Sequence, residues 1–217
     1  MELEVLFPFW SKLSHTEKNF VEKAVFTEKY NKGMLMHRTD GSCKGLITVL
    51  SGQLRTYIVS EEGREVTLFR VNANEVCVLS ASCLMDTITF DVLIEATEET
   101  EVLVFPSAIL NQLMQQNSQV ELFLYKSATE KFSDVMWTMQ QILFLKIDQR
   151  VAQFLWDEMV QKNCMTLSLT HDEIARYIGS AREVVTKVLK YMVKEQVLEL
   201  KRGTIMILDK EKLRAYM

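Results

Sequence analysis

Short hydrophobic runs that favour β-structure alternate with turn residues through the N-terminal half of the chain. The runs are rich in Val, Ile, Thr and Leu, and segments such as Ser-Gly and Glu-Glu-Gly separate them. Short strands at this spacing predict a compact antiparallel sandwich or roll, in which glycines supply the turns that need positive φ. The runs are Leu46–Leu50, Leu54–Val59, Val66–Phe69, Thr87–Ile94 and Val102–Phe105.

The pattern changes after Pro106, because neither glycine nor proline occurs again before Gly179. Apolar residues then recur every three or four positions, which predicts one long helix over roughly residues 119–143. Two interpretations of this stripe are open: it packs on the sheet of its own chain, or it forms the seam of a homodimer. The stripe consists of Val120, Leu124, Ala128, Phe132, Val135, Met139 and Ile142.

Residues 170–189 have the pattern of two short helices joined by a tight turn. Thr170 and Glu173 form a capping box that starts the first helix, and Ser180 and Glu183 form a second one. Gly179 lies between them and suits the sharp turn of a helix–turn–helix, which also needs a small residue where the helices cross. The second helix is expected to bury Val184, Val185, Val188, Leu189 and Met192.

The outward residues at the start of the second helix suit the DNA major groove. Arg donates two hydrogen bonds to guanine, and Glu accepts from cytosine. Residues 197–208 read as a hairpin turning at Arg202-Gly203, so the pattern predicts a winged helix whose tip meets phosphates. The predicted base-reading residues are Arg182, Glu183, Thr186 and Lys187, and the predicted backbone contacts are Thr170, Ser180, Ala181, Lys190, Lys201 and Arg202. The alternative is an amphipathic helix pair with ordinary surface charges.

Charge is divided along the chain in a way that favours the DNA interpretation. The 217 residues carry a net charge of −4, which argues against a polycation that coats nucleic acid. Residues 1–147 have a net charge of −6, and residues 148–217 have a net charge of +2. Within residues 176–202, seven basic and three acidic residues give a net charge of +4, so the positive charge coincides with the helix–turn–helix.

Several classes of protein are disfavoured. The acidic N-terminus lacks the basic region of a signal peptide, and no uncharged stretch has the composition of a membrane span. Four cysteines form no disulfide framework in a chain of this size, so a cytoplasmic, reduced setting is expected. No HExxH, P-loop, GxSxG or CxxC motif occurs, and the three histidines are not clustered, so we expect neither an enzyme nor a metal site.

The chain resembles the CRP/FNR family of bacterial transcription regulators over nearly its whole length. The resemblance is carried by Leu169-Thr-His-Asp-Glu-Ile-Ala, by Ile178-Gly-Ser-Ala-Arg-Glu-Val-Val and by the strands around Leu50-Ser-Gly-Gln-Leu-Arg55. It implies an α+β fold with an N-terminal antiparallel β-roll of the double-stranded β-helix, jelly-roll-like type (1–117), a dimerisation helix and hinge (118–145) and a C-terminal winged helix–turn–helix (146–217). Arg182 and Glu183 match the family's base-reading pair, whereas Lys187 replaces its usual Arg.

The same resemblance implies a homodimer on a palindromic operator in double-stranded DNA, with RNA polymerase as a candidate partner and no membrane association. The effector residues depart from the family. Asn74-Glu75 stands where the nucleotide-binding members have Gly-Glu, and Phe90 stands where they have the phosphate-binding Arg. Val135 and Met136 replace hydroxyl residues that meet the base. We therefore expect an unknown small-molecule effector and no binding of cyclic AMP.

Other roles for the roll are open. Cys77 and Cys83 could sense redox state or ligate iron or haem, His37 could be a haem ligand, or the roll could act through protein contacts. The simpler interpretation is that the cysteines pack as small hydrophobic residues. The expected effector pocket comprises Glu75, Cys77, Ser80, Ser82, Cys83, Phe90, Val135 and Met136.

Overall fold

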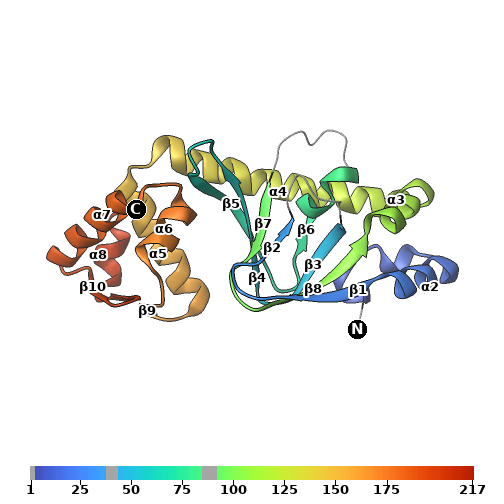
Figure 1. Ribbon diagram of the computed structural model, residues 1–217, viewed down its shortest axis with the longest axis horizontal. Helices are drawn as coiled ribbons and strands as arrows, with labels where there is room; N and C mark the ends of the chain where they lie inside the picture. Colours follow the sequence, from blue (N-terminus) through green and yellow to red (C-terminus); the bar gives the residue numbers. More distant parts are fainter. Residues whose placement is uncertain (1–2, 38–43, 85–91) are drawn as a thin grey trace. The chain divides into compact units, whose positions relative to one another are not determined.

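The computed structural model describes residues 3–37, 44–84 and 92–217. By their internal contacts these divide into two compact units, Met1–Ile58 with Leu68–Met136 and Val59–Thr67 with Trp137–Met217. The predicted α+β architecture is confirmed, with antiparallel sheets in the first unit and a helix–turn–helix with a hairpin in the second (Figure 1).

The first unit is a β-roll of two four-stranded sheets. One has the order β1-β8-β3-β6 and the other the order β2-β7-β4-β5. The register places Ile47 of β3 opposite Val104 of β8, and Thr56 of β4 opposite Ile94 of β7. The strands are β1 (Phe26–Tyr30), β2 (Leu35–His37), β3 (Gly45–Ser51), β4 (Gln53–Val59), β5 (Glu65–Asn72), β6 (Val76–Cys77), β7 (Leu93–Ala96) and β8 (Thr100–Pro106).

Short helices accompany the roll, and the long predicted helix follows it. The short elements are α1 (Leu3–Leu6), η1 (Trp10–Lys12), α2 (His15–Ala24), η2 (Val78–Leu84) and α3 (Ser107–Gln116). The long helix, expected over roughly 119–143, is confirmed as α4 (Ser118–Phe144). Of the predicted strand run Thr87–Ile94, residues 87–91 lie outside the described part of the chain, and a strand begins at Leu93.

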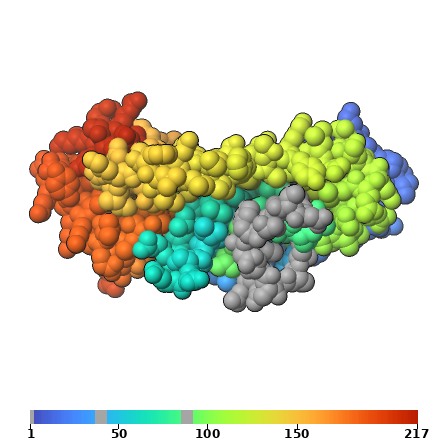
Figure 2. Space-filling view, turned by 90° about the horizontal axis from the view of Figure 1, so that it is seen from above, coloured from blue at the N-terminus to red at the C-terminus, as the bar shows by residue number. Residues whose placement is uncertain are grey.

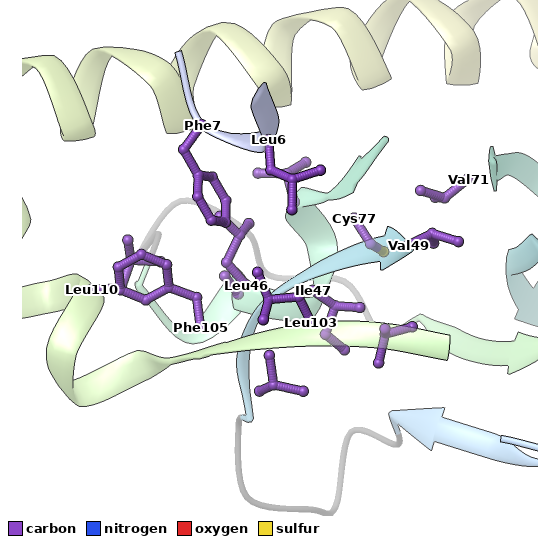
Figure 3. Close-up of a cluster of buried hydrophobic side chains, with 14 of the residues drawn as sticks. Leu6, Phe7, Leu46, Ile47, Val49, Val71, Cys77, Leu103, Phe105 and Leu110 are labelled. Atoms are coloured by element: carbon purple, nitrogen blue, oxygen red, sulfur yellow. The ribbon is translucent and has the colours of Figure 1, made fainter. Parts of the chain in front are cut away.

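The core of the roll joins its sheets to the N-terminal segment. Figure 3 shows Leu6 and Phe7 above the strands that carry Leu46, Ile47 and Leu103. The Phe7 ring meets Phe105 edge-to-face, with 5.6 Å between centroids. Such aromatic pairs add specific geometry to the hydrophobic burial that stabilises the roll.

The second unit buries a separate core among helices and a small sheet. Its elements are α5 (Ile147–Lys162), β9 (Thr166–Leu167), α6 (His171–Ile178), α7 (Arg182–Lys194), β10 (Leu198–Lys201), β11 (Thr204–Ile207) and α8 (Lys210–Arg214). The strands have the order β10-β11-β9, with Lys201 opposite Thr204 across the turn. The predicted hairpin at Arg202-Gly203 is therefore confirmed, and Gly203 has a φ of 72°.

Candidate DNA-binding site

Helix α6 starts and ends as the sequence predicts. The Thr170 hydroxyl accepts from the Glu173 amide at 3.1 Å, and the Thr170 amide donates to the Glu173 carboxylate at 2.8 Å. This reciprocal capping satisfies two backbone donors that the first turn of a helix leaves open. Gly179 closes the helix with a φ of 63°, a left-handed conformation that favours glycine. The first capping box and the turn glycine are therefore confirmed.

The second predicted capping box is wrong. Helix α7 begins at Arg182 with Ala181 as its N-cap, and a methyl group cannot accept a hydrogen bond. The reason lies in how α6 ends: the Ser180 amide donates to the Ala175 carbonyl at 2.9 Å, which makes Ser180 part of the closure of the preceding helix. The Ala181 carbonyl instead accepts from the Val184 and Val185 amides and so opens α7.

Helix α7 has a buried face and an exposed polar face. Val185, Leu189 and Met192 are fully buried in the core of the second unit. Val184 was expected on that face but is exposed. The predicted DNA-contact residues Arg182, Glu183, Lys187 and Lys190 are exposed along one side of α7, and Thr186 is half-buried.

Two contacts join the first turn of α6 to the predicted base-reading residues. An Arg182 guanidinium nitrogen lies 3.3 Å from a carboxylate oxygen of Asp172, with 62% and 51% of the two side chains exposed. His171 Nδ1 lies 2.9 Å from the Thr186 hydroxyl oxygen, and that hydroxyl donates to the Arg182 carbonyl at 2.8 Å. Burial, followed by the charges of Arg182 and Lys190, lowers the pKa of His171, against an opposing effect of Asp172.

The remaining predicted backbone contacts lie at the N-cap of α6, at the turn and on the wing. Thr170 and Ala181 are exposed, and Ser180 is half-buried. Lys201 and Arg202 are exposed at the end of β10, where Lys201 Nζ lies 3.5 Å from a Glu199 carboxylate oxygen. The helix–turn–helix and the wing thus present cations from two separate elements of one unit, which suits phosphate contacts beside base contacts.

In the expected effector pocket, Cys77 and Ser80 have structural roles. Both are fully buried, and the Ser80 hydroxyl donates to the Cys77 carbonyl while accepting from the Ile47 amide at 3.0 Å. Burial raises the pKa of the Cys77 thiol. A buried thiol with a raised pKa is a poor nucleophile, so these contacts favour the interpretation of Cys77 as a packing residue.

The other predicted cysteine, Cys83, is exposed and disulfide-bonded, whereas Cys77 and Cys164 are free thiols. A single disulfide at Cys83 is no disulfide framework, and the sequence did not predict it, because spacing does not show which cysteines come within bonding distance. Ser82 is half-buried beside it. Phe90 lies outside the described residues.

The turn at Asn74-Glu75, which stands at the family's Gly-Glu position, is held by its own hydrogen bonds. Asn74 has a φ of 67°, and its amide donates to the Val49 carbonyl at 2.8 Å. The Glu75 amide donates to the Asn72 carbonyl at 3.0 Å, and the Glu75 carboxylate accepts from the Asn72 amide at 3.0 Å. These amides are therefore committed within the protein, whereas phosphate recognition needs cations or unpaired N–H donors.

Sequence reasoning missed Lys131, which extends from α4 toward the roll. Its ammonium nitrogen lies 3.0 Å from an Asp134 oxygen, 3.9 Å from a Glu75 oxygen and 5.3 Å from the centre of the Phe69 ring. Sequence reasoning also missed His171 and Asp172, although both stand inside the capping box of α6. No local sequence signal marks these two residues, because their contacts with α7 arise only from the packing of α6 against α7.

The predicted stripe on α4 divides into two groups. Val120 and Leu124 are buried in the core of their own roll, and Ala128 and Val135 pack against it. Phe132, Met139 and Ile142 are exposed, as is the expected pocket residue Met136. Figure 2 shows the yellow C-terminal half of α4 at the molecular surface. Val120, Leu124, Ala128 and Val135 therefore stabilise the roll, and the predicted dimer seam stays a prediction.

Residues 3–37, 44–84 and 92–217 contain neither a candidate membrane span nor a candidate metal cluster. No helix in this part of the chain has the length and apolarity to cross a membrane. The same residues contain no cluster of three or more His, Cys, Asp or Glu side chains suited to a metal ion.

Known families and proteins match both units. Residues 27–117 match the cyclic nucleotide-binding domain, and residues 149–216 match the Crp-like helix-turn-helix domain. The transcriptional activator Anr of Pseudomonas protegens is 28% identical over 186 residues, which cover 82% of this chain and 75% of Anr. The cAMP-activated global regulator Vfr of Pseudomonas aeruginosa is 23% identical over 206 residues, or 90% of this chain and 94% of Vfr.

A solved structure gives a nearer match. A Crp/Fnr-family transcriptional regulator from Eubacterium rectale is 40% identical, with a TM-score of 0.94 over 97% of this chain and 98% of that one. Identity and coverage at this level, together with the two domain matches, establish the family. The chain belongs to the CRP/FNR family of transcriptional regulators, with a cyclic nucleotide-binding domain and a DNA-binding helix–turn–helix.

Proposed function

We propose that this regulator is a homodimer that reads a palindromic operator in double-stranded DNA under the control of a small effector other than cyclic AMP. The observation that carries the proposal is helix α7, which buries Val185 and Leu189 while Arg182, Glu183 and Lys187 remain exposed. Arg and Glu on one exposed face match the donor and acceptor pattern of base edges in the major groove. Lys201 and Arg202 of the wing fit phosphates.

The dimer seam that we propose lies on α4. Seven exposed positions, six of them apolar and one threonine, recur at steps of three and four residues, which is the heptad pattern of a two-stranded coiled coil. All seven positions are exposed in the single chain, so they are free of its own core. The seam is Leu122, Tyr125, Thr129, Phe132, Met136, Met139 and Leu143. Two parallel copies of α4 would bring two helix–turn–helix units to one duplex, as a palindrome requires.

Each of the three parts of the chain has its own proposed function. We assign residues 1–117 to effector binding, 118–145 to dimerisation and the hinge, and 146–217 to DNA binding. An effector that binds one arrangement of the α4 pair more tightly than another would shift the population toward it and so change DNA affinity. The regulator acts in the cytoplasm, where it meets DNA and RNA polymerase.

The effector is expected to differ from cyclic AMP because Phe90 stands where the nucleotide-binding members have their phosphate-binding Arg, and Asn74 stands where they have the glycine of Gly-Glu. Lys131, the cation next to Glu75, lies near two carboxylates that offset its charge. Calorimetric titration with cyclic AMP at micromolar concentrations should give no binding heat. A saturable binding isotherm in that range would refute this part of the proposal.

The DNA-binding role is tested by mobility shift with the DNA upstream of the protein's own gene, followed by selection from a random duplex pool. We expect a two-fold symmetric site. Arg182→Ala should relax the preference at one base pair of each half-site by about 1–3 kcal/mol. Lys201→Ala should weaken binding to all DNA sequences alike and reduce the salt dependence of the binding constant by about one phosphate contact. Equal effects of both variants on base preference would contradict the assigned roles.

A further inference from the structure

The first turn of the preceding helix contacts the guanidinium of Arg182 directly and its backbone carbonyl through Thr186. At its tip, the Arg182 guanidinium lies 3.3 Å from the Asp172 carboxylate. At its backbone, the Arg182 carbonyl accepts from the Thr186 hydroxyl, whose oxygen lies 2.9 Å from His171 Nδ1. Because that hydroxyl donates its hydrogen to the carbonyl, it accepts from an Nδ1–H of His171. Asp172 thus contacts the Arg182 side chain directly, whereas its neighbour His171 reaches the Arg182 backbone only through Thr186.

We infer that Asp172 is a positioning residue that sets the base preference of Arg182. The inference rests on the proposed function, in which Arg182 reads a base. A guanidinium carries five donors in a planar fork, so a carboxylate on one edge leaves the other edge for a base. The pair restricts a long side chain that would otherwise sample many rotamers, and that restriction lowers the entropy lost on binding DNA.

The carboxylate of Asp172 lowers the affinity for DNA of any sequence, so its place beside Arg182 calls for a specific explanation. Residues 176–202 have a net charge of +4, yet this carboxylate stands beside the residue assigned to the DNA bases. A negative charge there repels phosphates and weakens binding to any sequence. With about half or more of each side chain exposed, the pair also contributes little to folding. A role in base preference accounts for a carboxylate whose ion pair contributes little to folding and whose charge lowers general DNA affinity.

A purely structural role for Asp172 makes a different prediction. The residue lies in the first turn of α6, where a negative charge interacts favourably with the helix dipole. If that were its whole role, its replacement would lower the stability of the second unit and weaken binding to every duplex in proportion. Positioning of Arg182 instead predicts effects of opposite sign: base preference falls, while affinity for non-specific DNA rises.

The test uses the full-length protein and duplexes selected from a random pool by the wild type. Dissociation constants are measured for the selected site, for all single base-pair changes of one half-site and for a duplex of unrelated sequence. The variants are Asp172→Asn, Arg182→Ala, the double variant and Asp172→Glu. Thermal unfolding of each variant checks that the second unit remains folded.

We expect Asp172→Asn to lower the preference about fivefold at the same base pair that Arg182→Ala relaxes. The same variant should bind the unrelated duplex more tightly, and in the Arg182→Ala background it should change no base preference. Asp172→Glu keeps the charge and should retain part of the preference. Glu199→Gln is the matched control, because it removes the carboxylate beside Lys201 of the wing. It should change the affinity for all DNA sequences alike.

The outcomes separate the inference from the proposed function. A wild-type protein with no sequence preference overturns both. A wild type that reads its site, with an Asp172→Asn variant of unchanged base preference, overturns the inference alone. The inference is also overturned if Asp172→Asn loses preference at base pairs whose preference Arg182→Ala leaves intact. It is likewise overturned if the losses of base preference in the two single variants add in the double variant.

Discussion

The proposed coiled-coil seam can be tested at Phe132, the most central large side chain of the heptad. In the single chain 63% of its surface is exposed, so a partner helix has most of the ring to cover. Full burial of a phenylalanine contributes about 1.5–3 kcal/mol, and a symmetric dimer buries two copies. Scaled by the exposed fraction, loss of both rings should weaken association by about 2–4 kcal/mol, or roughly 30- to 700-fold in the dissociation constant.

Phe132→Glu removes both rings and places two carboxylates opposite each other, which adds repulsion to the lost burial. The single chain should still fold, because an exposed position of a helix tolerates glutamate. Gln140→Glu is the matched control, since Gln140 is exposed on the same helix but outside the seam. Sedimentation velocity over a dilution series, with circular dichroism as a check of folding, measures both variants against the wild type.

The result that would refute the seam is specific. If Phe132→Glu has the dimer dissociation constant of the wild type, the exposed heptad is not the dimer interface. If Gln140→Glu weakens the dimer as much as Phe132→Glu, added charge on the helix explains the loss and the heptad assignment fails. Weakening confined to Phe132→Glu, with helix content unchanged, supports it.

Three further predictions address folding, pH dependence and thiol chemistry. Leu189 is fully buried between α7 and its neighbours, so Leu189→Ala should lower the free energy of unfolding of the second unit by about 2–5 kcal/mol in denaturant titrations, whereas truncation of exposed Lys190 should change it little. The pKa of His171 is lower in the folded protein than in the unfolded chain, so the unfolded chain binds more protons and the free energy of unfolding should drop as the pH falls from about 7 to about 5. The variant His171→Asn keeps a donor for Thr186 and should lose that part of the pH dependence. An unchanged pH profile of stability in this variant would contradict the assignment. Native protein treated with iodoacetamide should be alkylated at exposed Cys164 and protected at buried Cys77 by mass spectrometry, whereas rapid labelling of Cys77 would revive the thiol-sensor interpretation.

The parts of the fold that sequence reasoning predicted are those with strong local signals. The capping box of Thr170 and Glu173, the turn at Gly179 and the hairpin at Gly203 each depend on a few neighbouring residues, and each was found in the structure. Helix α2 carries the same signal, since Ser14 and Glu17 form a capping box, and it was overlooked. Strand β1 was missed because only Tyr30 of its five residues is buried, so it lacks a hydrophobic run.

The site residues that were missed depend on packing between elements. Nothing in the segment Thr170-His-Asp-Glu shows that His171 and Asp172 meet Thr186 and Arg182, because those contacts arise only when α6 and α7 cross. The second capping box failed for a related reason: Ser180 and Glu183 have the right spacing, but the closure of α6 takes the Ser180 amide first. Ser180 could serve either as the N-cap of α7 or in the closure of α6, and in the structure its amide closes α6.

The long helix shows how the period of a hydrophobic pattern separates folding from assembly. Its predicted stripe advanced mostly in steps of four and led from the buried Val120 and Leu124 to the exposed Ile142, so it passed from one face of α4 to another. The exposed residues from Leu122 to Leu143 instead keep a repeat of 3.5, which is the period that holds one face toward a partner helix. Phe132 and Met139 belong to both sets. One apolar face of α4 packs on the roll of its own chain and ends where the roll ends. The exposed heptad continues beyond that point to Leu143. This continuation favours a second copy of the chain as the partner of the exposed face.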